Sequence, residues 1–413
     1  MNTNITVYNA SSVPSFCVGN PLSEALPPLP SDGGLVGALL KPPRGDFSLE
    51  RAGCASSFYE ISSLLDINVP RPESPIVTTR IFSMIHNTYA RINPLSVDFV
   101  RSVNEIDKEL ILRNEKREFQ SDAMTLLAWS GMGKTTLIRS IAELLPRVIE
   151  HTAYNGKPFI QKQVVWLSVD APVGGSPKGF MLNVGQALDK ALGLSGSARY
   201  QDALEGLSAE SMKVHIARAL RIHCVGLLHV DDVQRWGEAD AKLRLTSVAM
   251  LVGLSNTIGC SLLLSGTPEA LTVLQTSFES SRRANRRSAV ILESPLAIDD
   301  VFFTALIDYL FSFQVCQPQV APTTAMRKVL LTLTAGVPGV LTSLYVATQE
   351  TALTLNVPLS SALFQEVMQS DFAILSKSVK DLRALRSKGR NSWDAEVDKQ
   401  FSNFLDTRAK EKK

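Results

Sequence analysis

The pattern of hydrophobic and polar positions is most regular in the middle of the chain. Between about residues 121 and 295, short apolar runs alternate with amphipathic segments. The apolar runs predict five β-strands, at 124–129, 163–170, 225–232, 260–266 and 289–294. The segments between them predict helices at 134–147, 178–193, 208–222, 240–256 and 268–287. Such alternation is typical of a parallel sheet with crossover helices, so the predicted fold class is α/β.

The flanking sequence has helical rather than strand-like spacing. Residues 76–120 carry apolar positions at three- and four-residue steps, and residues 296–375 do the same without any strand pattern. Residues 1–75 are rich in Ser, Pro and Gly and have no sustained period, which predicts a partly disordered segment. Residues 376–413 are highly charged and predict a partly ordered tail.

Composition narrows the class of protein only modestly. With 413 residues, 45% of them hydrophobic, the chain is long enough for two structured domains. The 42 basic and 40 acidic residues give a net charge of +2, so binding to a polyanion must come from local patches. The five cysteines lack metal-site spacing and indicate reduced thiols, at 17, 54, 224, 260 and 316.

Neither a secretory signal nor a membrane span is expected. The first residues lack both a basic start and an apolar core. Two uncharged runs, 245–268 and 329–349, contain polar residues or an AGVPG break, which favours buried helices and strands over a span. We therefore expect a cytoplasmic protein without membrane partners.

The turn after the first predicted strand has the composition of a phosphate loop. Such a loop needs glycines whose backbone N–H groups turn toward the phosphates, a lysine for the terminal phosphates and a hydroxyl for magnesium. The candidate nucleotide-binding residues are Ser130, Gly131, Met132, Gly133, Lys134, Thr135 and Thr136. Ala128 replaces the usual first glycine, but it is small and we expect the loop to form. A turn that only caps a helix is the alternative.

Two acids end the third predicted strand, as in a Walker B motif. Asp231 is the candidate magnesium ligand together with Thr135. Asp232 is the candidate group that polarises the attacking water, where Glu is the commoner residue. Because Asp is one methylene shorter, slow or gated hydrolysis is expected. The alternative role for the pair is a helix N-cap.

The fourth strand ends in hydroxyl side chains. Ser265 and Thr267 are candidates for contact with the terminal phosphate or its water. An ordinary strand-to-helix turn, with Pro268 as the first helical residue, explains the same pattern.

A cluster of arginines follows in SSRRANRRSAV. Arg282, Arg283, Arg286 and Arg287 crowd one helix face, where they repel unless phosphate or acidic groups bind them. In a ring-forming ATPase, Arg286 or Arg287 is the candidate arginine that reaches the neighbour's terminal phosphate. A solvated basic turn or a plain DNA-binding patch is the alternative.

Together these motifs fit an AAA+ P-loop ATPase core at 121–295 followed by a helical lid at 296–375. A closer resemblance begins at DAPVGGSPKG, which resembles the D-x-P-x-x-G-S-x-K-G pattern of the TnsC/TniB transposition regulators. The matching residues are Asp170, Pro172, Gly175, Ser176, Lys178 and Gly179. Residues 84–96, 264–275, 284–296 and 382–398 also resemble segments of that family, so the resemblance spans about residues 80–398.

This resemblance implies an ATP- and magnesium-dependent regulator of DNA transposition. Such a protein assembles as a ring or filament on double-stranded DNA and links a target-selecting protein to the transposase, here in the bacterial cytoplasm at the nucleoid. Lys178 and Ser176, beside a helix start, would contact DNA phosphates without reading bases. The tail at 376–413 would bind partner proteins.

Two other classes of ATPase remain open. One is a signalling ATPase, although the sequence has no obvious effector or sensor domain. The other is an initiator or clamp-loader relative, although we see neither a winged DNA-reading domain nor a lid arginine in AGVPGVLTSL. Asp232 and the missing lid arginine both argue against rapid turnover.

Overall fold

A computed structural model describes residues 6–45, 47, 56–103, 121–196, 199–238, 241–274, 289–293 and 297–387. The chain forms two compact units. The first comprises Met1–Leu39, Glu73–Ser130 and Lys134–Leu292, and the second comprises Leu40–Pro72, Gly131–Gly133 and Glu293–Lys413. The N-terminal residues thus contribute to both units, whereas the sequence predicted a separate segment at 1–75.

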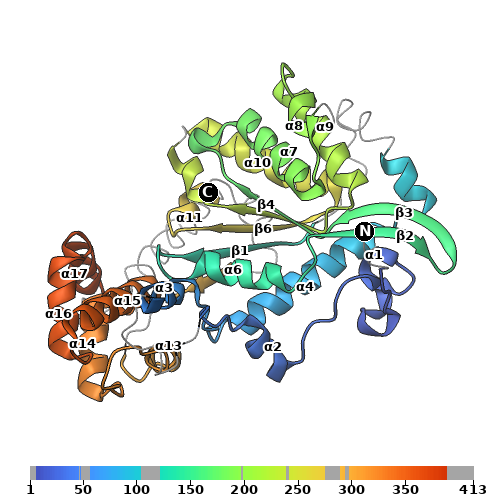
Figure 1. Cartoon of the computed structure of the whole chain (residues 1–413). Helices are drawn as coiled ribbons and strands as arrows, with labels where there is room; N and C mark the ends of the chain where they lie inside the picture. The colour runs from blue at the N-terminus through green and yellow to red at the C-terminus, as the bar shows by residue number, and fades with distance from the viewer. Residues whose placement is uncertain are drawn as a thin grey trace, which may run out of the picture. The chain divides into compact units, whose positions relative to one another are not determined.

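The first unit is built on a five-stranded sheet (Figure 1). Its strands are β1 (Ala123–Ala128), β4 (Trp166–Asp170), β5 (Leu227–Asp231), β6 (Ser261–Gly266) and β7 (Ala289–Leu292), in the order β4-β5-β6-β1-β7. All neighbouring pairs are parallel, which confirms the predicted α/β fold. β1 and β6 are buried at every position, as central strands covered on both faces must be.

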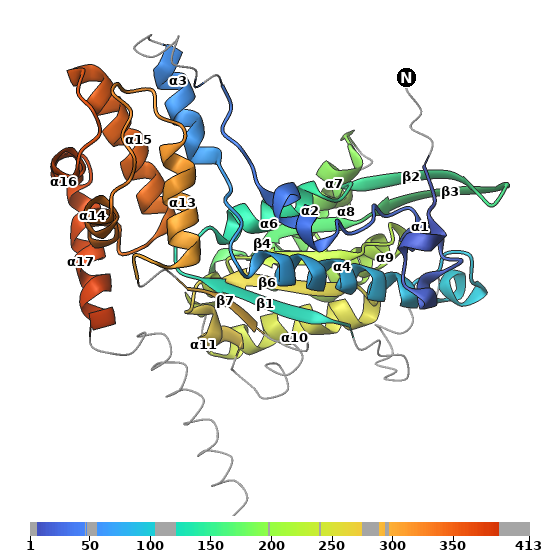
Figure 2. The ribbon, with the colours of Figure 1, turned by 90° about the horizontal axis from the view of Figure 1, so that it is seen from below.

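Helices cover both faces of this sheet. Helices α4 (Ser74–Arg91) and α6 (Lys134–Glu143) lie on one face, and α10 (Ala241–Ile258) and α11 (Ala270–Leu274) lie on the other (Figure 2). Helices α7 (Pro177–Leu192) and α9 (Ala209–Ile222) pack against each other and against α10. Short elements connect them: η6 (Val173–Gly175), α8 (Tyr200–Ala203) and η8 (Val233–Glu238).

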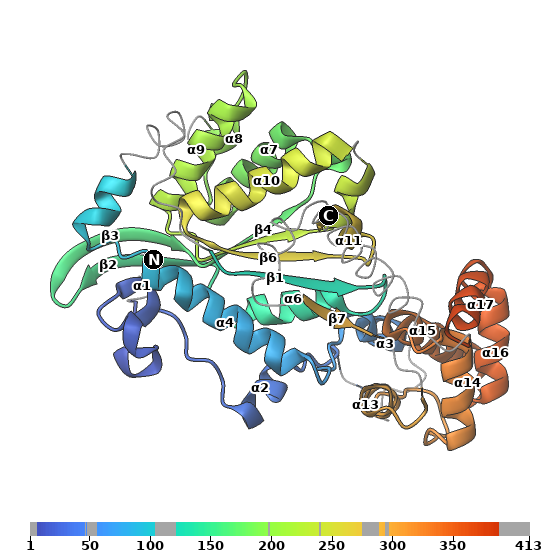
Figure 3. The ribbon, with the colours of Figure 1, turned by 180° about the vertical axis from the view of Figure 1, so that it is seen from behind.

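A two-stranded ribbon extends beyond the sheet and was not predicted. Strands β2 (Val148–Tyr154) and β3 (Lys157–Val164) pair antiparallel and run out next to α1 (Figure 3). The two residues between them, Asn155 and Gly156, have φ values of 49° and 75°. An Asn-Gly pair with positive φ is the turn that matches the twist of a two-residue hairpin.

Short helices at the N-terminus pack on the first unit. They are η1 (Ala10–Ser12), η2 (Ser15–Cys17), α1 (Pro21–Glu24) and α2 (Asp32–Leu39). The buried Asn20 side chain donates to the carbonyls of Tyr89 and Ile92 at 2.6 and 3.0 Å, and Tyr154 Oη donates to Glu24 at 2.8 Å. The structure thus differs from the predicted extended or partly disordered segment. Polar anchors and buried apolar side chains such as Leu22 and Leu35 hold these residues in place.

The second unit is helical, as predicted for the region after the sheet. It contains α13 (Val301–Phe311), α14 (Thr324–Thr334), α15 (Pro338–Leu355), α16 (Ser361–Ser370) and α17 (Ala373–Ser387). Two N-terminal elements, α3 (Ser56–Ser62) and η4 (Ser63–Asp66), complete its core, since Ile61 and Leu64 are fully buried among Phe303, Leu344 and their neighbours. The predicted charged tail at 376–413 begins inside α17, and residues 388–413 lie outside the described residues.

No single helix among the described residues is long and apolar enough to cross a membrane. Helices α14 and α15 meet that length and composition only as a pair, and they are bent by 116°.

Candidate nucleotide site

The predicted phosphate loop forms the turn from β1 into α6. Gly131 and Gly133 have φ values of 81° and 84°, a region that favours glycine. Lys134 is the first residue of α6, so the loop leads directly into a helix N-terminus, where free backbone N–H groups attract anions. Of the other predicted loop residues, Met132 is buried and contributes to packing, whereas the Thr135 side chain is exposed.

Lys134 and Asp231 form an ion pair with little solvent exposure. The Lys134 ammonium contacts Asp231 Oδ1, and the two side chains are 10% and 16% exposed. Ser265 Oγ donates to the same oxygen at 2.5 Å. Burial alone would raise the pKa of Asp231, but the hydrogen bonds from Lys134 and Ser265 outweigh it, so the pKa lies below its ordinary value. Three residues predicted from separate motifs therefore meet at one carboxylate.

A buried histidine extends this cluster across the sheet. His229 lies on β5, and its Nε2 is 2.8 Å from Ser265 Oγ while its Nδ1 is 2.5 Å from Ser168 Oγ on β4. Burial lowers the pKa of His229 to about 4, so the ring is neutral at pH 7. Sequence analysis missed both His229 and Ser168. The available signal was a histidine inside the otherwise apolar run VGLLHVDD.

Asp232, the predicted catalytic acid, is held at both carboxylate oxygens. Its Oδ1 accepts from Gln234 Nε2 at 3.0 Å, and its Oδ2 pairs with Arg235 Nη2 at 2.8 Å. Its backbone has φ of 55°, which is uncommon for a residue other than glycine. Sequence analysis did not single out Gln234 or Arg235.

Thr267 lies near this acid but does not bond to it directly. Its hydroxyl donates to the Glu269 carboxylate, and its backbone N–H donates to Gln234 Oε1 at 3.0 Å. The described contacts therefore place Ser265, rather than the Thr267 hydroxyl, beside the acids at the end of β5.

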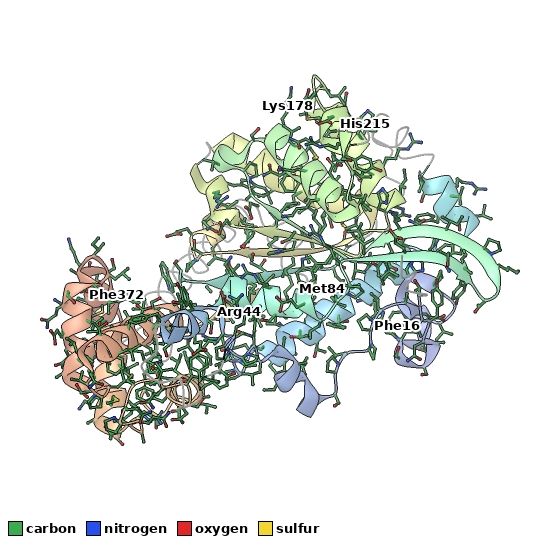
Figure 4. All side chains as sticks on the ribbon, viewed as in Figure 1. Phe16, Arg44, Met84, Lys178, His215 and Phe372 are labelled. Carbon is green, nitrogen blue, oxygen red and sulfur yellow. The ribbon has the colours of Figure 1, made fainter. Side chains whose placement is uncertain are left out.

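The candidate DNA-contacting residues lie at the start of α7. Ser176 is the N-cap, and its Oγ accepts from the Gly179 N–H at 3.1 Å. Lys178 is exposed, and its side chain projects outward at the edge of the first unit (Figure 4). Among the predicted site residues, Arg282, Arg283, Arg286 and Arg287 lie outside the described residues.

The donor groups of this site suit a nucleotide with magnesium. Loop N–H groups and the Lys134 ammonium are phosphate-binding groups, and the Asp231 carboxylate and the Thr135 hydroxyl are oxygen donors of the kind that magnesium prefers. Asp231 lies at the carboxyl end of a parallel strand, where ligands bind in open α/β sheets. The side chains of Lys134 and Asp231 are little exposed to solvent, so their charges interact more strongly than charges at the surface.

The core has a P-loop nucleotide-binding fold. Its glycine-rich loop joins a central parallel strand to a helix, and the lysine of the loop contacts an acid at the end of a nearby strand. Residues 117–274 match a family model described as an AAA domain. No curated protein sequence matches the chain.

Solved structures of similar fold include a Walker-type ATPase of Pyrococcus abyssi, with 11% identity and a TM-score of 0.40 over 69% of this chain and 75% of that one. Cdc6p from Pyrobaculum aerophilum has 15% identity and a TM-score of 0.36 over 67% and 66%. The ORC2 protein of Aeropyrum pernix in its ADP form has 13% identity and a TM-score of 0.35 over 68% and 70%. At such values these similarities say nothing about substrates or partners.

Proposed function

We propose that this protein is a magnesium-dependent ATPase whose nucleotide state controls its assembly on double-stranded DNA. The observation that carries the ATPase part is the convergence of Lys134, Ser265 and the strand-end acid Asp231 at one site. The sequence predicted these three residues from three separate motifs, and a helix cap or surface turn gives no reason for them to meet.

Each residue then has a distinct task. Lys134 would exchange Asp231 for the terminal phosphates, and Asp231 and Thr135 would hold the metal. Magnesium, when bound, supplies positive charge to the phosphate oxygens. Ser265 keeps Asp231 oriented through its 2.5 Å hydrogen bond. Asp232 orients the attacking water and accepts its proton. Because Asp is shorter than Glu, this step is slow and depends on assembly, in which Arg286 or Arg287 of a neighbouring copy completes the site.

We propose further that assembly regulates DNA transposition by linking a target-selecting protein to the transposase, in the bacterial cytoplasm at the nucleoid. The support is the resemblance of the segment 170–179 to the transposition regulators, together with the exposed Lys178 one residue inside α7. An exposed lysine at a helix start suits a phosphate contact that is independent of base sequence. The tail at 376–413 is the proposed binding site for the protein partners.

Electron microscopy tests assembly directly. Protein with plain duplex DNA, magnesium and ATP should form rings or filaments at low salt, and protein without nucleotide should not. Monomers that persist with ATP and DNA would refute the assembly proposal. Nucleotide-dependent assembly that needs no DNA would instead favour a signalling ATPase.

A pair of lysines on one helix tests the DNA contact. Lys178 and Lys190 are both exposed on α7, the first at its start and the second in its last turn. Lys178→Ala should weaken DNA binding at every sequence tested and lower the slope of log affinity against log salt by about one. Lys190→Ala should change neither. Equal effects of the two substitutions would indicate general charge rather than a contact at the helix start.

A further inference from the structure

Gln234 connects the ends of two neighbouring strands through its side-chain amide. Its Nε2 donates to Asp232 Oδ1 at 3.0 Å, just after β5. Its Oε1 accepts from the Thr267 backbone N–H at 3.0 Å, just after β6. Both polar atoms of the amide are therefore engaged, one by the candidate catalytic acid and one by the backbone of the adjacent strand end.

A glycine makes room for this amide. A Cβ built at Gly266 would lie 2.5 Å from Gln234 Oε1 and 3.1 Å from Ala270 Cβ. Carbon and oxygen atoms do not approach to 2.5 Å without one of them moving, so any side chain at Gly266 displaces the Gln234 amide. The glycine at the end of β6 is thus explained by close packing, because its φ is not in the left-handed region.

The position of Asp232 depends strongly on this neighbourhood. The side chain is 31% exposed, and its two oxygens are held by Gln234 and by Arg235, whose side chain is 39% exposed. Both partners belong to η8, the short helix that follows the acid. Gln234 also accepts from the Thr267 N–H just after β6, so it relates the carboxylate to the end of that strand.

The end of β6 thereby contacts both acids. Ser265 donates directly to Asp231 at 2.5 Å, and the Thr267 N–H reaches Asp232 through the Gln234 amide. We infer that Gln234 is a positioning residue that fixes the Asp232 carboxylate relative to the end of β6, so that a shift of Ser265–Thr267 on nucleotide binding moves the acid. This inference rests on the proposed ATP hydrolysis and concerns the residue that aligns its water-activating group.

Three variants and a matched control test this role by steady-state ATP hydrolysis and nucleotide binding. Gln234→Ala removes the amide, Gly266→Ala displaces it, and Gln234→Glu keeps its shape but turns an acceptor oxygen toward Asp232. Each should lower kcat by about tenfold or more, since a misplaced general base forfeits most of its contribution. KM and the dissociation constant for ATP should stay within about twofold, because no phosphate-binding group is changed. Gly237→Ala, in η8 with its nearest neighbour 3.7 Å from the added Cβ, is the glycine control.

The double variant Gln234→Ala/Gly266→Ala separates positioning from general damage. If the glycine acts through the amide, the kcat of the double variant should be no lower than that of the slower single variant, because the two changes break one interaction. The inference would be overturned if the decreases in kcat of the two single variants multiply in the double variant. It would also be overturned if the kcat of Gln234→Ala stays within about twofold of wild type. A wild-type protein that binds ATP but never hydrolyses it, with or without DNA, would instead refute the proposed function and the inference with it.

Discussion

The folded protein should lose stability at acid pH because the His229 ring is buried. The side chain is 2% exposed and lies between Ser168 and Ser265, and burial lowers its pKa from 6.5 to about 4. In the unfolded chain the same ring binds a proton near its ordinary pKa. Between these two values the unfolded state therefore binds more protons than the native state, so stability falls as pH decreases from 6.5 to 4 and levels off below 4.

The expected loss of stability follows from the difference between the pKa values of His229 in the unfolded and native states. Each pKa unit corresponds to about 1.4 kcal/mol, so the full effect of His229 is about 3 kcal/mol, of which about 2 kcal/mol is present at pH 5. At pH 7 the effect is close to zero because both states carry a neutral ring. Since total stabilities are about 5–15 kcal/mol, a loss of this size is easily measured.

The test compares wild type with His229→Gln in urea at pH 7 and pH 5, without nucleotide and with a chelator. The variant loses packing and is less stable at pH 7, but its deficit should shrink by about 2 kcal/mol at pH 5 because the proton-linked loss is absent. Trp166 provides a local fluorescence signal, since its ring centroid is 6.0 Å from that of His229. His215→Gln on the exposed surface of α9 is the control for a His-to-Gln substitution away from the site.

A deficit that stays constant between pH 7 and pH 5 would refute this reasoning. The other buried histidines titrate in both proteins and cancel in the comparison, so they cannot produce or hide the effect.

Three further predictions concern the site and the second unit. Lys134→Ala should abolish ATP binding and ATP-dependent DNA assembly together, measured by equilibrium binding and electron microscopy, and assembly that survives would refute the site assignment. Replacing Arg286 and Arg287 with Ala should spare ATP binding by isolated subunits but reduce hydrolysis or assembly, whereas a loss of DNA affinity alone would make them backbone contacts. Leu64→Ala should destabilise the second unit by about 2–5 kcal/mol in thermal or urea unfolding, because Leu64 is fully buried. The adjacent Leu65, which is 55% exposed, is the control and should lose less than about 1 kcal/mol.

The sheet was predictable because its central strands β1 and β6 are buried at every position and β5 at all but its last. The observed β4, β5, β6 and β7 lie within the predicted apolar runs, and β1 begins one residue before its run. Parallel strands covered on both faces tend to be continuously apolar. The β2–β3 ribbon mixes buried, intermediate and exposed positions with polar residues between apolar ones, so it has no such run. Its clearest signal was the Asn155-Gly156 pair, which marks a hairpin turn only when flanking strands are also recognised.

The N-terminal helices were missed for a different reason. Elements as short as α1 or η2 span about one turn, so they have no room for a helical period. Asn20 caps α1 and donates to the carbonyls of Tyr89 in α4 and of Ile92 just after it, residues about seventy positions away. Tertiary anchors of this kind leave no local pattern, and the abundance of Pro and Gly favoured a prediction of disorder instead.

The candidate site divides into a part that sequence motifs describe and a part that they do not. Lys134, Asp231 and Ser265 stand at fixed places relative to a loop or a strand end, so their convergence followed from the fold. His229 and Gln234 bond partners from other parts of the sheet, Ser168 on β4 in one case and Thr267 just after β6 in the other. Such pairs become visible only when the register of β4, β5 and β6 is known.

The two parts also differ in how easily they can respond to a nucleotide. The chain of contacts from His229 through Ser265 to Asp231 and Lys134 is largely buried, and a buried polar network with its members paired resists rearrangement. Asp232 and Arg235 are about one-third exposed, and an ion pair at that exposure contributes little stability, so exchanging its partner costs little. In the mechanism proposed above, phosphate binding breaks the Lys134–Asp231 contact, and Ser265 passes that change to β6. Asp232 would then follow β6 through Gln234, so that the Gln234 side chain couples nucleotide occupancy to catalytic alignment.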